Sequence, residues 1–201
     1  MTIDTSLLKG RHVYLELLQP RHREPLRQLA RDERIWEFTK TLLPGDAFDG
    51  CFDTYFNTAL DADALGFQQV FVIRQAADDA LIGMTRLYGV SFTDKRVEIG
   101  YTWYIPAVWG GPHNKECKLL LLQYVFETLR FNRAEFRVAG QNIRSQKAVE
   151  KIGGVREGWL RKTGYRPDGS LRDTVIFGII DDEWPLKKEN LLRLLAESEN
   201  R

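Results

Sequence analysis

A change of hydrophobic period between residues 97 and 116 constrains the fold of this chain more than any other feature. Up to residue 105, apolar side chains alternate with others, as in a strand with two distinct faces. One face is expected to carry Val97, Ile99, Tyr101, Trp103 and Ile105, and the other Glu98, Gly100, Thr102 and Tyr104. Pro106 follows directly and has no N–H to donate to a sheet. The pattern therefore predicts a strand over Val97–Ile105 that ends at the proline.

A helix is expected to follow this strand after the glycine pair Gly110-Gly111. From Asn114 onward the apolar period is about 3.6 residues, set by Leu119, Leu122, Phe126 and Leu129. The first N–H groups of a helix have no partner within it, and the helix dipole is positive there, so this turn is suited to an anion. Lys115 stands in the first turn, within reach of a bound phosphate. The alternative is a plain tight turn, and a glycine pair by itself does not decide between the two.

The remaining pattern predicts strands and helices of a single domain. Further strands are expected at His12–Leu18, Gln68–Gln75, Ala80–Val90, Ala134–Ala139, Val155–Tyr165 and Leu171–Ile180. Helices are expected at Arg21–Phe38, Phe48–Leu60, Asn114–Arg130 and Lys187–Ser198, with a short one that Asn142 caps and Gly153-Gly154 ends. This order predicts an α+β fold over residues 1–201, with a mixed, mostly antiparallel, twisted sheet flanked by helices.

Composition argues against several classes of function. With 201 residues and 43% hydrophobic content the chain can bury one sizeable core, and a net charge of +1 argues against a dedicated nucleic-acid binder. Arginines recur along the first predicted helix, but acidic residues alternate with them, which favours a solvated helix face. No apolar run is long enough to span a membrane, and neither Cys51 nor Cys117 belongs to a metal-ligand pattern. We expect a cytoplasmic protein without a metal site.

Several short motifs, taken in order, carry a resemblance to a known family. They are Glu98-Ile99-Gly100-Tyr101, the turn Trp109–Glu116, the segment from Asn142 through Ser145 and Ala148 to Gly153, the hairpin turn Arg166–Asp173, and Asp181–Trp184. Together they resemble the GNAT acetyltransferases, in particular the RimJ/RimL-like branch of ribosomal-protein N-acetyltransferases. The resemblance extends from about Leu8 to Trp184. It implies the same α+β fold, and that fold is compatible with a homodimer.

The resemblance implies a binding site for acetyl-CoA, which leaves as CoA. In the family, the backbone of the central strand binds the pantetheine arm and the following turn binds the pyrophosphate. The residues that these roles fall on are Trp103, Tyr104, Ile105, Gly110, Gly111, His113, Asn114 and Lys115, with further contacts from Asn142 and Ser145. The family pattern Gln/Arg-x-x-Gly-x-Gly/Ala is altered here to Trp109, Pro112 and Asn114. Because Pro112 has no N–H, we expect a rearranged set of turn amides around the phosphates.

Glu98 is the candidate for the base in the reaction that the resemblance implies, which is direct attack of a neutral amine on the acetyl thioester. It is expected to act directly or through a water molecule. The alternative is that Glu98 is a cross-strand partner of Lys95 or of an arginine, and both interpretations stay open. An α-amino group with a pKa of about 8 loses its proton at pH 7 for about 1 kcal/mol, whereas a lysine costs about 4.6 kcal/mol. A water-mediated base therefore suits an N-terminal amine better than a lysine.

Ser145 is the candidate that assists the leaving thiolate. Many family members place a tyrosine on the short helix for this purpose, and the matching position here is Val149. Tyr101 and Tyr104 are further candidates, and the alternative for Ser145 is a small residue that allows close packing. Cys117 is interpreted as a small residue buried against the sheet, with a covalent acetyl-cysteine route as the alternative.

These inferences predict an acetyl-CoA-dependent N-acetyltransferase whose acceptor is a primary amine, either a protein N-terminus or a small molecule. The aromatic segment Trp36–Leu60 and the hairpin Tyr165–Arg172 are expected to shape the choice of acceptor. The alternative is a non-catalytic module that binds acyl-CoA as a sensor or as a partner-binding domain. The missing tyrosine at Val149 and the altered turn at Pro112 keep this alternative open.

Overall fold

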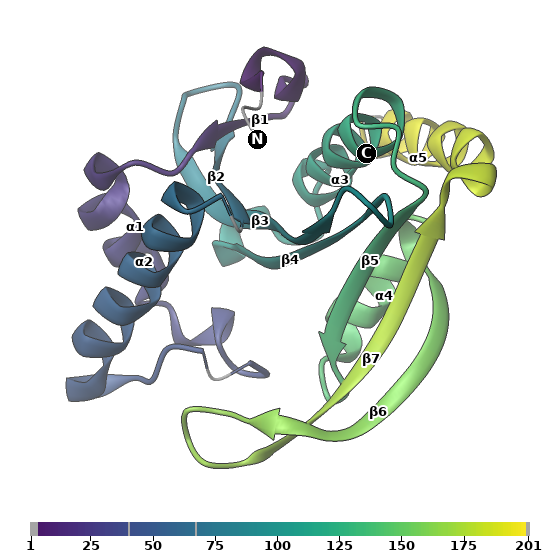
Figure 1. Ribbon diagram of the computed structural model, residues 1–201. Coiled ribbons are helices and arrows are strands. Elements are labelled where there is room, and N and C mark those ends of the chain that lie inside the picture. Colours follow the sequence, from purple (N-terminus) through teal and green to yellow (C-terminus); the bar gives the residue numbers. More distant parts are fainter. Residues whose placement is uncertain (1–3, 40, 67, 200–201) are drawn as a thin grey trace.

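A computed structural model describes residues 4–39, 41–66 and 68–199; the outermost residues of the predicted domain, 1–3 and 200–201, lie outside this description. Seven strands form one sheet in the order β1-β2-β3-β4-β5-β7-β6 (Figure 1). They are β1 (Val13–Leu17), β2 (Gln68–Gln75), β3 (Leu81–Ser91), β4 (Arg96–Tyr104), β5 (Arg133–Ala139), β6 (Val155–Tyr165) and β7 (Leu171–Ile180). Neighbours run antiparallel except for β4 and β5, which are parallel. The predicted mixed, mostly antiparallel sheet is confirmed.

Helices cover both faces of the sheet. They are α1 (Arg23–Ala30), α2 (Phe48–Ala64), α3 (His113–Gln123), α4 (Ile143–Lys151) and α5 (Trp184–Glu199), and a π-helical turn, Tyr124–Thr128, extends α3. Short 3-10 turns lie at Thr5–Leu8, Pro20–His22, Glu33–Ile35, Gly45–Ala47, Pro106–Val108 and Asp181–Glu183. Among the described helices, none combines the length and the apolarity that crossing a membrane requires.

The first helix is shorter than the sequence pattern predicts, because it ends at Ala30 instead of continuing to Phe38. Asp32 has an extended backbone, and its carboxylate accepts a hydrogen bond from the Arg34 N–H. The Trp36 indole N–H donates to the Ala30 carbonyl at 2.7 Å. These side-chain contacts occupy backbone groups that a continuing helix would pair, so the helix stops and a new turn begins.

Two hydrophobic clusters pack against opposite faces of the sheet. The cluster that includes Phe71, Ile73 and Ile99 packs with α3 and α5, and we call its side the α3 face. The cluster that includes Val70, Val72, Met84 and Trp103 packs with α1 and α2, and we call its side the α2 face. Figure 1 shows the same separation, with α1 and α2 on one side of the central strands and α3 and α5 on the other.

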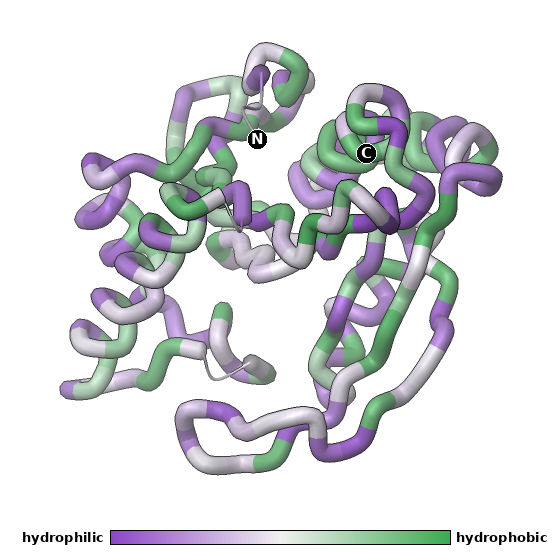
Figure 2. The backbone as a smooth tube through the Cα atoms, viewed as in Figure 1, coloured by the Kyte–Doolittle hydropathy of each residue, from purple (hydrophilic) through white to green (hydrophobic). Residues whose placement is uncertain are grey.

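Arginines along α1 connect this helix to α2. Hydrophilic and hydrophobic residues alternate along α1 (Figure 2). The guanidinium groups of Arg23, Arg27 and Arg31 lie over the rings of Phe56, Phe52 and Phe48 at 4.6, 4.7 and 4.6 Å. Asp49 and Asp53 of α2 pair with the same arginines. The face of α1 that was expected to be solvated thus also contacts α2. The carboxylates of α2 neutralise the charge of these arginines.

Candidate functional site

A β-bulge in β4 decides which side chains face each side of the sheet. Gly100 lies opposite Arg86, and Trp103 lies opposite Met84, so β4 has one residue more than β3 between these pairs. Tyr101 takes up the extra length with φ of +50°, a conformation that is uncommon for residues other than glycine. Val97 and Ile99 belong to the α3-face core, whereas Trp103 belongs to the α2-face core. The prediction that these residues share one face is therefore wrong for Trp103, whereas Ile105 packs against the same core as Val97 and Ile99.

Beyond Glu98, β4 no longer pairs with β5, so one edge of β4 is open. The two strands pair only where Arg96–Glu98 lies beside Arg133–Glu135, and they diverge afterwards (Figure 1). The Ile105 N–H is bonded to the Ile82 carbonyl of β3 at 2.9 Å, so by alternation the backbone groups of Tyr104 point to the opposite, open edge. The same alternation places Thr102 there, a residue that the sequence interpretation missed. The amide of Ile105 is committed to β3.

Trp109 lies against this open edge. Its indole N–H donates to the Tyr104 carbonyl at 2.9 Å, and its ring contacts both hydrophobic clusters. The guanidinium of Arg144, on α4, lies 3.9 Å from the centre of that ring. The family pattern at this position is a glutamine or arginine, and here a tryptophan instead ties the turn to β4.

The turn before α3 presents backbone N–H groups at a helix N-terminus. Gly110 has φ of +78° and open space around it, and Pro112 immediately precedes α3. The first intrahelical bond runs from the Glu116 N–H to the Pro112 carbonyl. The N–H groups of His113, Asn114 and Lys115 therefore have no acceptor within the helix. The turn retains the capacity to hold an anion even though Pro112 donates nothing.

The ammonium of Lys115 is hydrogen-bonded within the protein, and the ring of His113 is neutral. Lys115 is 7% exposed, and its ammonium donates to the Gly111 carbonyl at 3.0 Å and to Ser198 Oγ of α5 at 3.1 Å. A phosphate contact by this ammonium would compete with these bonds. Burial lowers the pKa of His113, which keeps its ring neutral at pH 7. Anion binding at the turn thus depends on backbone amides, the helix dipole and the nearby charge of Lys115.

Glu98 points to the α2 face, between β3 and β5. Its Oε2 lies 3.0 Å from Nε of Arg137, which also lies 3.0 Å from Oε1 of Glu135. Burial raises the pKa of Tyr88, and the neighbouring Glu98 carboxylate raises it further. The structure therefore shows the arginine partner that the sequence left open, and that partner is Arg137.

Asn142 and Ser145 lie at the start of α4. The Asn142 side chain accepts a hydrogen bond from the Ser145 N–H at 2.9 Å, which confirms the predicted N-cap. Both residues are half-buried. Val149, which stands where many family members carry tyrosine, is buried in the α3-face core. Ser145 is the hydroxyl-bearing residue of this helix.

The side chain of Tyr104 lies on the α3 face, away from the open edge that its backbone faces. It is fully enclosed beside Cys117, and burial raises the pKa of both groups. A buried thiol with a raised pKa stays protonated and is a poor nucleophile. The interpretation of Cys117 as a small buried residue agrees with this environment.

Lys118 is a buried amine that the sequence interpretation did not identify. Its Nζ donates to Thr102 Oγ1 at 2.7 Å, and Thr102 Oγ1 lies 2.8 Å from Thr85 Oγ1. Burial lowers the pKa of this lysine to about 8. The amine therefore hydrogen-bonds β4 just after the bulge, on the α3 face. Because its positive charge is poorly solvated there, keeping the lysine protonated costs free energy of folding.

We expect this cost to appear as a pH dependence of stability. The pKa of Lys118 is about 8 in the folded protein and about 10.4 in the unfolded chain. Between these two pH values the unfolded state binds more protons than the folded state, so the free energy of unfolding rises with pH. The gain is on the order of 3 kcal/mol. Urea unfolding at pH 7 and pH 10 should show a smaller rise with pH for Lys118→Met than for the unmodified protein. Equal pH dependence of the two proteins would contradict the low pKa.

Arg86, also missed by the sequence interpretation, lies on the α2 face of β3. It is 3% exposed, and its guanidinium lies between the rings of Tyr55 and Tyr101. The signal was present, because Arg86 is the one charged residue in the otherwise apolar run Leu81–Leu87. Tyr55 belongs to the aromatic segment that was expected to shape the choice of acceptor.

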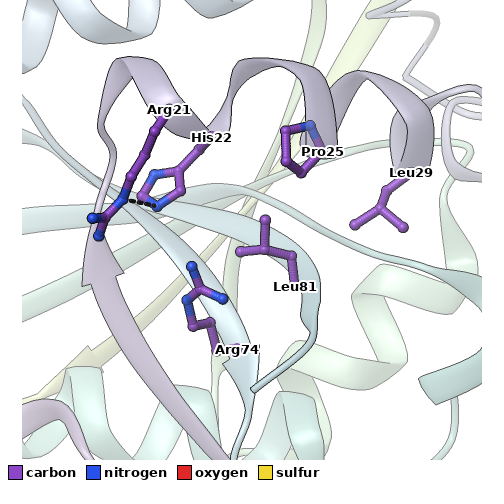
Figure 3. Close-up of a pocket in the computed structure, with 6 residues that line it drawn as sticks. All are labelled: Arg21, His22, Pro25, Leu29, Arg74 and Leu81. Atoms are coloured by element: carbon purple, nitrogen blue, oxygen red, sulfur yellow. Dashed lines mark hydrogen bonds between the residues drawn. The ribbon is translucent and has the colours of Figure 1, made fainter. Parts of the chain in front are cut away.

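A separate surface pocket lies beside α1, with a volume of about 400 Å³. Figure 3 shows Arg21 and His22 at one end of the pocket and Arg74 near them. Both arginines pair with Glu16, Arg74 also pairs with Asp79, and burial lowers the pKa of His22, so the charges at this end of the pocket balance. Its lining does not include residues of β4 or of the turn before α3.

Comparison with known proteins places this geometry in context. Residues 12–155 match the family model described as acetyltransferase (GNAT) domain. YdaF of Bacillus subtilis (strain 168), for which a ribosomal N-acetyltransferase function has been suggested, is 29% identical over 188 residues, covering 88% of this chain and 96% of YdaF. A GCN5-related N-acetyltransferase from Brucella melitensis has 27% identity and a TM-score of 0.83, covering 94% of this chain and 84% of that structure.

A more distant structure shares the fold alone. Spermidine N-acetyltransferase from Vibrio cholerae, solved in complex with CoA and spermine, has 19% identity and a TM-score of 0.69. The match covers 88% of this chain and 99% of the other.

Proposed function

Because this chain belongs to the GNAT acetyltransferase family, we propose that it transfers the acetyl group of acetyl-CoA to a primary amine. The observation that carries this proposal is the open edge of β4, where the backbone of Thr102 and Tyr104 lies just before the N-terminal turn of α3. One surface thus offers strand-like backbone pairing for an extended amide chain and helix amides for phosphates.

The binding site that we propose for acetyl-CoA runs along this edge. The pantetheine amides pair with the backbone of Thr102 and Tyr104, in the strand segment that Trp103 and Ile105 complete. The pyrophosphate accepts hydrogen bonds from turn amides, drawn from Gly110, Gly111, His113, Asn114 and Lys115. Asn142 and Ser145, at the start of α4, line the opposite side. The Tyr104 carbonyl already accepts from Trp109, but a carbonyl oxygen has two lone pairs and can accept a second bond.

The chemistry follows from these positions. The neutral amine attacks the thioester carbon, so a C–N bond forms and negative charge develops on the carbonyl oxygen. Backbone N–H groups at the open edge stabilise that charge, the C–S bond breaks, and CoA thiolate leaves. Glu98 accepts the proton of the amine through water, and the Ser145 hydroxyl donates a hydrogen bond to the sulfur. A thiol with a pKa of about 8.5 leaves readily, so a hydrogen bond is sufficient help.

The relatives support a primary amine as the acceptor without agreeing on one molecule. The name of YdaF refers to ribosomal proteins, and the Vibrio cholerae enzyme acts on spermidine. A protein N-terminus and a small amine therefore both stand as acceptors in this proposal.

Calorimetric titration with acetyl-CoA, CoA and ATP tests the binding site first. We expect acetyl-CoA and CoA to bind and ATP not to bind, because the contacts to the pantetheine arm are absent from ATP. Continuous measurement of free thiol in the presence of peptides and small amines then tests turnover. Binding of acetyl-CoA without thiol release for any amine would support a sensor module instead, and no binding at all would reject the proposed site.

A further inference from the structure

Arg86 carries a positive charge that no carboxylate balances within the described part of the chain. Its Nη1 donates to Gln68 Oε1 at 3.1 Å, and its Nε is buried without a hydrogen-bond partner. No described aspartate or glutamate lies within 4.0 Å of its guanidinium. Burial of an unpaired charge is costly, and proteins usually offset it with a counter-ion.

Among the described arginines that stack on aromatic rings, Arg144 and Arg156 also lack a carboxylate partner but are exposed, so Arg86 is unusual in being buried as well. Arg27 also stacks on an aromatic ring, that of Phe52, but Glu24, Asp49 and Asp53 pair with it. Arg86 stacks between the rings of Tyr55 and Tyr101 at 4.9 and 4.3 Å with no such partner. Stacking also occurs at exposed arginines without a carboxylate partner, so it does not by itself explain the burial of this charge.

The contacts that the guanidinium already makes determine which of its N–H groups can bind a ligand. The ring centres of Tyr55 and Tyr101 lie 4.9 and 4.3 Å from its central carbon, and Gln68 occupies Nη1. The edge formed by Nε and Nη2 presents two parallel N–H groups, which is the geometry that a carboxylate binds in a bidentate manner. Nε is buried in this structure, so a carboxylate reaches this edge when the Tyr101 ring, which is 50% exposed at the bulge of β4, moves aside.

The position of Arg86 relates it to the acceptor and not to the cofactor phosphates. It lies opposite Gly100 on the α2 face, and Glu98 lies two residues further along β4 on the same face. Diagonal neighbours of this kind are about 7–8 Å apart. The turn that is suited to phosphates precedes α3, beyond the other end of the strand.

We propose that Arg86 binds a carboxylate of the amine acceptor, so that the preferred acceptors are amines that carry a carboxylate group. This inference rests on the proposed acetyl transfer, and it names the class of acceptor that the site selects. Two sources have this chemistry: a free amino acid, through its own carboxylate, and a peptide N-terminus followed by an acidic side chain.

The first test compares matched acceptors on the unmodified protein. Thiol release is measured for free amino acids against their amides, and for C-terminally amidated peptides with glutamate against glutamine at the second position. Rates are corrected for the fraction of neutral amine. Hydrogen bonds to charged groups contribute about 1.5–3 kcal/mol. In at least one of the two comparisons, the kcat/KM of the carboxylate acceptor should therefore be about 10- to 100-fold higher than that of its amide, mainly through a lower KM. The comparison that shows the preference identifies whether the carboxylate comes from a free amino acid or from a peptide side chain.

The second test uses variants. Arg86→Gln should remove this preference while leaving acetyl-CoA binding unchanged, and Arg86→Lys, which keeps the charge but lacks the fork, should keep part of it. Arg27→Gln, which removes a stacked arginine that is already paired, should keep the full preference. Thermal unfolding of each variant checks that it is folded. The comparison of acid and amide on the unmodified protein needs no variant.

The outcomes separate this inference from the proposed function. If amines are acetylated with equal efficiency whether or not they carry a carboxylate, the function of Arg86 is overturned and the acetyltransferase proposal stands. If calorimetry shows no binding of acetyl-CoA, the proposed function fails. The shift of Tm caused by the same acids and amides then tests the carboxylate site directly: stabilisation by the acids alone supports it, and equal shifts reject it.

Discussion

Replacing Glu116 by alanine is expected to lower the free energy of unfolding by about 4 kcal/mol. The Glu116 carboxylate is 7% exposed and accepts hydrogen bonds from the N–H groups of Arg11, His12 and Val13 at 2.9, 2.6 and 2.7 Å. Gly10 packs so closely on this carboxylate that a Cβ there would collide with it. Removal of the carboxylate takes the acceptor of these hydrogen bonds away from three backbone N–H groups at once. The midpoint of urea unfolding measures the loss.

The matched control is Glu150→Ala, because Glu150 is an exposed glutamate of α4. Exposed substitutions of this kind change stability by about 0.5 kcal/mol or less. Glu116→Gln should give an intermediate loss of stability. The amide oxygen can accept some of the hydrogen bonds, but the NH₂ group faces backbone N–H donors and cannot accept from them. A loss below about 1 kcal/mol for Glu116→Ala would show that water replaces the carboxylate, and the stabilising role of these three hydrogen bonds would be wrong.

This contact matters for the site because Glu116 belongs to the first turns of α3. It joins the start of β1 to the helix whose N-terminal amides face the proposed pyrophosphate position. Lys115, one residue earlier, connects the same turn to α5 through Ser198. Two consecutive charged side chains thus hold the turn in place, and neither extends into solvent.

Glu98→Gln is expected to lower kcat/KM for acetylation about 100-fold at pH 6.5 and much less at pH 9. General-base catalysis contributes about 10²- to 10⁴-fold, and an α-amine with a pKa of about 8 is mostly protonated at the lower pH. At pH 9 the amine is already neutral, so a base adds little. The measurement is the pH profile of thiol release with a saturating concentration of acetyl-CoA.

Glu135→Gln is the control for this experiment. Glu135 lies beside Glu98 in the parallel pairing of β4 and β5 and contacts the same Arg137, but it belongs to the other strand. Its variant should keep the shape of the pH profile. Both variants should bind acetyl-CoA as the unmodified protein does. A profile of Glu98→Gln that is parallel to that of the unmodified protein would show that Glu98 is a structural partner of Arg137 and no base.

Local patterns were sufficient for much of the fold. The bounds of β2, β6 and β7 agree with the predicted strands Gln68–Gln75, Val155–Tyr165 and Leu171–Ile180. Asn142 caps α4 as predicted, because an N-cap is a contact between residues three apart in the chain. Alternation, helical periodicity and turn residues act over a few residues, so the sequence displays them directly.

The site residues that were missed depend on distant parts of the chain. Lys118 and Glu116 are buried because β1 and the bulge of β4 supply their hydrogen-bond partners, which lie far from α3 in sequence. Arg86 is enclosed because Tyr55 of α2 and Tyr101 of β4 meet over it. No periodicity within one element predicts such encounters.

The sequence by itself determined the order of strands and helices, the turns between them and the family to which they belong. Only the tertiary structure decided which side chains meet at the site. The β-bulge is the clearest case, because the positive φ of Tyr101 moves Trp103 to the α2 face and opens the edge of β4. A tyrosine has no intrinsic preference for that conformation. The pairing of β4 with β3 and the packing on both faces offset its cost, and these are long-range interactions.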